Sequence, residues 1–131
     1  MLLCGTSGRV HGVVEDGAHV SGEVIGWKLG TGSDSVTEKP RRSGWDAVLR
    51  IQWPSGVYER LCELPHVQLH VELHRPDGTE VIGEGTVVTC EPILDEDYGT
   101  LLRTDLHGLG PLTLRKAEKA FGRLAPVEFE D

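Results

Sequence analysis

The sequence predicts a mainly β fold, an antiparallel β-sandwich or barrel of about six to eight strands, with one short helix across the sheet and a possible C-terminal helix. Three observations predict this class. Residues 67–74 alternate apolar and polar side chains without exception, which is the period of a strand with one buried face. Residues 80–90 are rich in β-branched side chains, which favour strands. Between these two runs, residues 75–78 read Arg-Pro-Asp-Gly, a sequence typical of tight turns.

Length and composition narrow the class of protein. At 131 residues the chain is large enough for one domain with a substantial core. Its 17 glycines are nearly twice the average share of about 7%, which indicates many turns and close backbone contacts. A formal net charge of -8 argues against binding to nucleic acid or anionic membranes through the overall field. The three cysteines lack C-x-x-C spacing and are typical of reduced thiols in a cytoplasm, and no apolar run approaches the ~20 residues of a membrane span.

In the first half of the chain, residues 9–15 and 19–29 are expected to form two strands joined by an Asp-Gly turn, which is a strong hairpin signal. The apolar residues on one face of the second strand are Ile25, Trp27 and Leu29. Glycines on the opposite face, Gly22 and Gly26, indicate bulges or close approach of another backbone.

Residues 30–44 form a long polar segment that carries both signs of charge. A loop of this length in a compact domain is usually either functional or disordered. Both interpretations of the segment stay open at this point.

Residues 45–53 are expected to form the clearest strand of the first half, because their apolar side chains alternate and tryptophans stand at both ends. The strand at residues 67–74 presents a similar apolar face. We therefore predict that both strands contribute to one core, made of Trp45, Leu49, Ile51, Val67, Leu69, Val71 and Leu73.

After residues 80–90, an acidic link at residues 95–99 leads to a further strand at residues 100–106. Together with residues 67–74, these runs predict an antiparallel meander in the second half of the chain.

Two segments change to helical spacing. Residues 54–65 lie between prolines and place apolar side chains three and four apart, with Ser55 able to cap the start. Residues 114–124 carry one apolar stripe, which predicts the C-terminal helix. We expect residues 1–125 to form a single domain and residues 126–131 to form an acidic tail.

No catalytic or metal-binding pattern stands out. His66, His70 and His74 are four residues apart, but on a strand such neighbours lie about 13 Å from each other, too far to share one ion. The run Asp95-Glu96-Asp97 lacks the spaced donors and glycine of a calcium loop and reads as a solvated turn. No nucleophile and base have a recognisable local signature. The sequence therefore predicts no metal, no cofactor, no catalytic residue and no enzyme activity.

The order of several short pieces carries a resemblance to a known family. In chain order the pieces are Gly8 to Glu15 with its Asp-Gly turn, Val24-Ile25-Gly26-Trp27-Lys28-Leu29, the polar loop with Asp34, Ser43-Gly44-Trp45, Asp77-Gly78-Thr79, Gly83 to Thr89, and Gly108-Leu109-Gly110-Pro111-Leu112-Thr113. Together they resemble the major tail tube proteins of long-tailed bacteriophages over about two-thirds of the chain.

The resemblance implies a sandwich or barrel flanked by a helix, with six copies closing a ring and rings stacking into a hollow tube of the virion tail. The implied partners are further copies, other phage tail proteins, and DNA that passes without specific binding; no membrane is implied. The protein would be made in the cytoplasm of the bacterial host. Residues 114–124 depart from the family pattern, so a related tail terminator, adaptor or baseplate subunit stays open. Two alternatives come from other classes: a free-standing small β-barrel that binds a ligand or a peptide, and an enzyme built on a β-sandwich.

The resemblance also implies two sets of functional residues. In the family the long polar loop reaches a neighbouring ring. The resemblance therefore predicts an assembly loop in this chain, which consists of Ser33, Asp34, Ser35, Val36, Thr37, Glu38, Lys39, Pro40 and Arg41. An acidic subunit suits a conduit, because a basic lumen would hold DNA. The candidates for lining the lumen are Asp46, Glu72, Glu80, Glu84 and Asp105. Repulsion between like charges around a ring, screened over about 8–10 Å, predicts that rings form more readily as salt rises.

Overall fold

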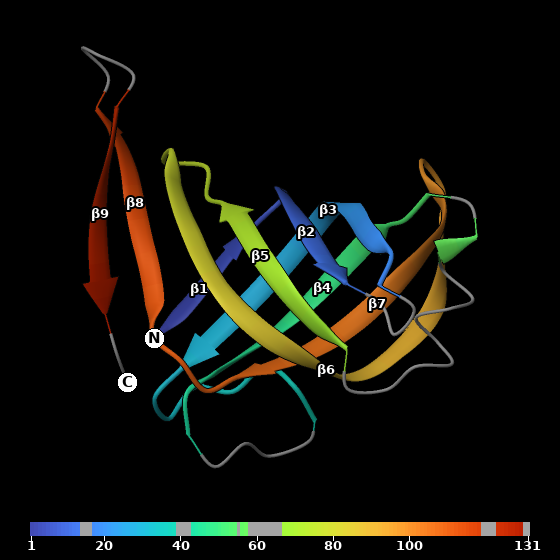
Figure 1. Cartoon of the computed structure of the whole chain (residues 1–131), viewed down its shortest axis with the longest axis horizontal. Coiled ribbons are helices and arrows are strands. Elements are labelled where there is room, and N and C mark those ends of the chain that lie inside the picture. Colours follow the sequence, from blue (N-terminus) through green and yellow to red (C-terminus); the bar gives the residue numbers. More distant parts are fainter. Residues whose placement is uncertain (14–16, 39–42, 55, 58–66, 119–122, 130–131) are drawn as a thin grey trace.

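The computed structural model of the chain describes residues 1–13, 17–38, 43–54, 56–57, 67–118 and 123–129. These residues are mainly strands, as the sequence predicts. Nine strands follow one another along the chain (Figure 1): β1 (Leu2–Gly5), β2 (Ser7–Val13), β3 (His19–Thr31), β4 (Trp45–Gln52), β5 (Gln68–His74), β6 (Thr79–Asp95), β7 (Gly99–Gly108), β8 (Leu112–Glu118) and β9 (Arg123–Phe129).

All strand pairings are antiparallel, and six of the strands form a closed circuit. The order is β5-β2-β3-β4-β7-β6, and β6 pairs in turn with β5. We call these six strands the closed sheet. β1 extends the edge of β3 that β2 also occupies. β8 pairs with the start of β6 and carries β9 on its other side, so that the β8–β9 hairpin stands at one end of the molecule (Figure 1).

The predicted meander in the second half is confirmed. β5 and β6 are joined by the Arg-Pro-Asp-Gly turn, in which Gly78 has φ of 88° and the N–H of Gly78 donates to the carbonyl of Arg75 at 3.0 Å. β6 and β7 pair from Thr86 to Asp95. Both strands run further than predicted, so that their hairpin extends well past the end of β5.

The predicted core is also confirmed. Six of its seven residues are at most 1% exposed and Val67 packs partly buried against them. In β3 the register shifts between Val24 and Gly26, which is the bulge that the glycine indicated. Because of this bulge Val24 faces the core, while Ile25, predicted to do so, is only half-buried.

The predicted C-terminal helix is wrong for the part of residues 114–124 that the structure describes. β8 covers Leu112–Glu118 and β9 starts at Arg123. The start of β6 offers an edge to which β8 pairs from Thr113 to Lys116, and Leu112 fills a core position with 2% of its surface exposed. A short helix has little stability of its own, so these tertiary contacts decide the conformation. β9 also crosses the expected boundary between domain and tail.

The other predicted helix, residues 54–65, lies almost entirely outside the described residues. In the part of the chain that is described, no helix is long and apolar enough to cross a membrane.

Candidate functional site

The segment between β3 and β4 is held by the carboxylate of Asp46, which is fully buried at the start of β4. The hydroxyl groups of Ser35 and Thr37 donate hydrogen bonds to Oδ2 of Asp46 at 2.5 and 2.7 Å. The backbone N–H groups of Val36 and Thr37 donate to the same oxygen at 3.2 and 3.1 Å. The Thr37 hydroxyl also lies 3.0 Å from Nε2 of His107 on β7. Three of the nine residues of the predicted assembly loop are therefore fastened to their own domain.

The protonation of Asp46 follows from these contacts. Burial acts to raise the pKa of the carboxyl group, but the hydrogen bonds from Ser35, Thr37 and Val36 outweigh burial, and the pKa is lowered from its ordinary value of 3.8. Asp46 is thus a charged group that organises residues 35–37 around itself.

Asp46 does not face open solvent as a lumen residue would. Alternation along β4 correctly placed it on the face opposite the core, but alternation cannot show that a loop folds back over that face. Residues 39–41 of the predicted assembly loop lie outside the described residues.

Three of the other lumen candidates lie together on the outer face of β5 and β6. Glu72 and Glu84 both approach the ring of His70, at 3.5 and 3.3 Å, and Glu80 approaches His74 at 3.4 Å. The imidazole of His11 on β2 stacks on that of His70 with ring centres 4.6 Å apart. The register also places two arginines in this face, with Arg9 opposite Glu72 and Arg115 opposite Glu80.

The pairing of histidine with glutamate on this face was not predicted from the sequence, although a signal for it exists. Folding residues 67–74 onto residues 79–87 about the turn at Gly78 sets His74 opposite Glu80 and His70 opposite Glu84. The fifth lumen candidate, Asp105, lies elsewhere. Its carboxylate is on β7, 3.8 Å from the guanidinium of Arg103.

The hairpin of β6 and β7 projects beyond the closed sheet. Pairing of β6 with β5 ends at Thr86, and pairing of β7 with β4 ends at Leu102. We call residues 94–100 the arm tip; all of them are exposed except Asp95, which is half-buried. Oδ1 of Asp95 accepts hydrogen bonds from the N–H groups of Asp97 and Tyr98 at 2.8 and 3.1 Å, so the acidic run forms a turn, as predicted.

The arm tip exposes large apolar side chains beside its acidic ones. Leu94 is 89% exposed and Tyr98 is 47% exposed. Glu96 and Asp97 are exposed next to them. Single exposed apolar residues are common on proteins, but two of them beside exposed carboxylates at the end of a projecting hairpin form a candidate contact surface.

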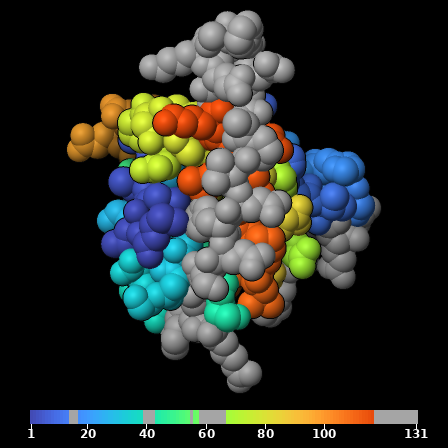
Figure 2. Space-filling model, turned by 90° about the vertical axis from the view of Figure 1, so that its left-hand side faces the viewer, coloured from blue at the N-terminus to red at the C-terminus, as the bar shows by residue number. Residues whose placement is uncertain are grey.

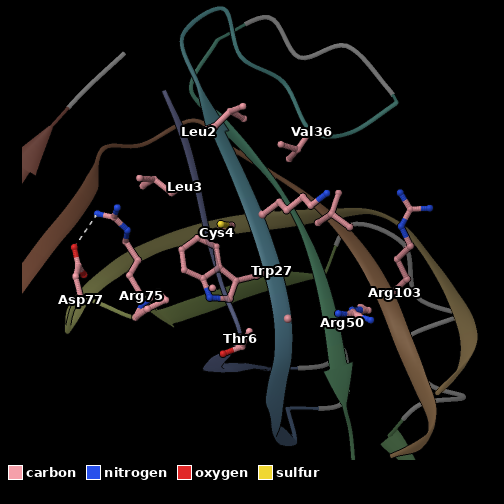
Figure 3. Close-up of a pocket in the computed structure, with 15 residues that line it drawn as sticks. Leu2, Leu3, Cys4, Thr6, Trp27, Val36, Arg50, Arg75, Asp77 and Arg103 are labelled. Carbon is pink, nitrogen blue, oxygen red and sulfur yellow. Dashed lines mark ion pairs between the residues drawn. The ribbon is translucent and has the colours of Figure 1, made fainter. Parts of the chain in front are cut away.

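An open hollow of about 850 Å³ lies on the outer side of β1, β3, β4 and β7 (Figure 3). Its charged lining consists of four cations and one carboxylate, namely Lys28, Arg50, Arg75, Arg103 and Asp77. Its apolar lining includes Leu2, Val36 and Val48. In the view of Figure 2 the N-terminal residues, coloured dark blue, lie at the surface between the cyan residues of the β3–β4 segment and the yellow-green residues near the β5–β6 turn.

Two of the four cations in the hollow are already paired. Arg75 lies 3.6 Å from Asp77, and Arg103 lies 3.1 Å from Glu91. The guanidinium of Arg50 lies over Gly26, where a Cβ atom would come within 2.8 Å of Nη2. The glycine therefore provides the space in which Arg50 lies against the sheet.

Among the described residues no group of three histidines, cysteines or carboxylates is arranged to hold a metal ion. The carboxylates with a lowered pKa, Asp46 and Asp77, each bind the backbone of their own loop or turn. Comparisons with protein-family models, with curated proteins and with solved structures find no match to this chain.

Proposed function

We propose that this protein is a structural subunit of a bacteriophage tail. Identical copies close into rings, with six copies in each ring as the resemblance to major tail tube proteins implies. The rings stack into a tube through which DNA passes. The observation that carries the proposal is the arm tip, with Leu94 89% exposed at the end of a hairpin that leaves its own sheet. A two-stranded hairpin is at best marginally stable by itself in water. Such an arm is explained when another chain packs against it.

The closed sheet supports an architectural role over ligand binding. We describe it as a small β-barrel whose interior is filled by side chains. Trp45, Leu49 and Leu106 each have at most 1% of their surface exposed. Small-molecule sites usually occupy clefts of about 300–1,000 Å³ that bury most of the ligand. A filled barrel leaves no such volume inside, and the hollow of about 850 Å³ on its outer side is open rather than enclosed. Both observations disfavour a free-standing module that binds a small ligand.

Strand edges give a second means of joining copies. In the described part of the chain, β1 pairs with β3 alone and β9 pairs with β8 alone. Each of these strands therefore presents a row of N–H and C=O groups that a strand of another copy can pair with. Repeated head-to-tail contacts of one kind close into a ring when the rotation between copies divides a full turn.

The outer face of β5 and β6 is the surface that we propose to line the passage. Glu72, Glu80 and Glu84 lie there together, and carboxylates repel the phosphates of DNA. Arg9 and Arg115 on the neighbouring strands offset part of this charge, so a weakly acidic wall is expected.

The test is the oligomeric state of the intact chain and of a variant without the arm tip. Residues 94–100 are replaced by Asn-Gly, which joins the paired residues Ile93 and Leu101 by a two-residue hairpin turn. Light scattering and negative-stain images are expected to show rings or tubes for the wild type and folded monomers for the variant. A second variant keeps the arm length and changes only Leu94 to Ser and Tyr98 to Thr, which separates the role of the apolar side chains from that of the backbone.

The outcome also distinguishes the possible roles of the protein. Single rings that do not stack would indicate a tail terminator, adaptor or baseplate subunit. A wild type that stays monomeric at every accessible concentration and salt would refute the proposal and favour a free-standing module.

A further inference from the structure

We propose that the arm tip of one copy docks into the hollow of a neighbouring copy, so that this pair of surfaces is the contact that joins subunits. The partner is a second copy of this chain. The inference rests on the proposed function for self-assembly, and it adds which surfaces meet and which side chains recognise each other.

Charge complementarity is the first argument. In a chain of net charge -8, the hollow gathers four cations and one carboxylate. Arg75 and Arg103 have ion-pair partners within the chain. Lys28 and Arg50 have none within the described residues. The arm tip offers the matching pair, because Glu96 and Asp97 are exposed while Oδ1 of Asp95 is engaged in the turn.

Apolar complementarity is the second argument. The hollow exposes Leu2, which is 61% exposed, and includes Val36 and Val48. Its volume of about 850 Å³ leaves ample room for the side chains of Leu94 and Tyr98. A tyrosine ring that enters beside Arg50 also meets a planar guanidinium, a favourable contact between a cation and an aromatic face.

The arm tip does not reach the hollow of its own chain. Arg103 lines the hollow, and β7 is extended from Gly99 onward. At about 3.3 Å per residue, the start of β7 lies about 13 Å beyond Arg103, pointing away from the hollow. Figure 1 shows the β6–β7 connection and the N-terminal strand β1 at well-separated places along the long axis. The contact is therefore between copies, and it joins two different surfaces, which is the arrangement that builds rings or helical tubes.

A cysteine already present in the hollow allows a direct test. Cys4 is an exposed free thiol in the lining of the hollow (Figure 3). The variant Glu96→Cys places a second thiol on the arm tip. A short bismaleimide added to assembled protein is expected to give a ladder of covalent multimers on denaturing gels, at least tenfold above the yield of the matched variants Cys4→Ser/Glu96→Cys and Ser21→Cys. Ser21 is an exposed residue on β3 that does not line the hollow.

Charge exchange gives an independent readout. Lys28→Glu with Arg50→Glu is expected to weaken association at least tenfold in light scattering, and so is Glu96→Lys with Asp97→Lys. Combining all four changes is expected to restore association to within threefold of the wild type, since each ion pair is re-formed with reversed sign. A combined variant that assembles no better than either pair alone would contradict the docking.

Failure of the docking can be told apart from failure of the proposed function. Wild-type rings that show no cross-link above the Ser21→Cys level and no response to the charge changes would overturn the docking and leave ring assembly standing. A wild type that never assembles would overturn both.

Discussion

Replacing Asp46 tests whether a buried carboxylate holds the loop between β3 and β4. Oδ2 of Asp46 accepts two short hydrogen bonds from the hydroxyl groups of Ser35 and Thr37. A hydrogen bond to a charged group contributes about 1.5–3 kcal/mol, and a neutral one about 0.5–1.5 kcal/mol. Asp46→Asn keeps one carbonyl oxygen and removes the charge, so we expect a loss of about 2 kcal/mol in the free energy of unfolding. Asp46→Ala removes the acceptor altogether, and we expect a loss of about 4 kcal/mol.

The assay is urea unfolding followed by tryptophan fluorescence. It is carried out in the variant with Asn-Gly in place of the arm tip, because association would otherwise add a concentration-dependent term to stability. The matched control is Glu23→Gln, which removes a carboxylate from an exposed position of β3 and is expected to change the free energy by less than about 0.5 kcal/mol.

The pH dependence of the same variants checks the charge. The pKa of Asp46 is lowered in the folded protein from an ordinary value of 3.8. A carboxyl group whose pKa is lower in the folded state stabilises the fold at pH values above its unfolded pKa, and this contribution is lost as pH falls through the folded pKa. The difference between wild type and Asp46→Asn should therefore be constant near neutral pH and shrink below about pH 4. An Asp46→Ala variant as stable as the control, or a difference that does not change in acid, would refute the anchoring role.

Three further predictions concern the core and the proposed passage. Leu69→Ala should cost about 2–5 kcal/mol in a denaturant titration, because Leu69 is 1% exposed; a change near zero would place it outside the core. Gly108→Ala should lower stability by about 1–3 kcal/mol or more, because the added Cβ would lie 2.1 Å from the Trp45 ring. Near-UV circular dichroism of the tryptophans would report the repacking. An unchanged melting curve would contradict the close packing. Reversal of Glu72 and Glu84 to lysine should leave the fold intact and make assembled tubes retain DNA at low salt; equal retention by mutant and wild-type tubes would show that this face does not line the passage.

The strands were predictable where the alternation of side chains was uninterrupted. β5 has a perfect period of two and one buried face, and the turn after it has the residues that its backbone angles require. β6 was predicted too short because Glu91-Pro92 interrupts the β-rich run. Proline lacks an N–H group and is tolerated in edge strands. β6 has become such an edge strand at Pro92, since its pairing with β5 ends at Thr86.

The C-terminal helix failed for a different reason. Leu114 fits either a strand, in which it shares one face with Leu112, or the helical stripe predicted for residues 114–124. A local pattern cannot choose between these when both fit. The choice was made by the edge of β6, where Thr113 pairs with Ile82 and Leu114 pairs with Val81, 31 and 33 residues earlier in the sequence.

Only part of each candidate site could be predicted from the sequence. Alternation along a strand shows which side chains face away from the core, but it does not show which other segment of the chain folds over them. A role in ring stacking alone would make the loop at residues 33–41 dispensable for folding. The contacts of Ser35 and Thr37 with Asp46 imply that its deletion would leave a buried carboxylate without these donors. A deletion made together with Asp46→Asn removes most of this penalty, so it is the fairer test of whether the loop also serves stacking.

The hollow is formed by strand pairing that the sequence alone does not show. Docking at the hollow would also change one prediction, the effect of salt on assembly. Lys28, Arg50 and Arg103 are scattered along the chain, yet the register sets Gly26 opposite Arg50 and Arg50 opposite Arg103. Net charge alone predicts that copies repel and that rings form more readily as salt rises. Docking of Glu96 and Asp97 onto this cationic surface predicts the opposite sign, because salt screens the attraction over about 8–10 Å. Light scattering of the wild type between low and high sodium chloride decides between them. The docking is supported if association of the wild type weakens with salt and this dependence is lost when Lys28 and Arg50 are both changed to alanine. Association that strengthens with salt in both proteins would show that repulsion governs assembly.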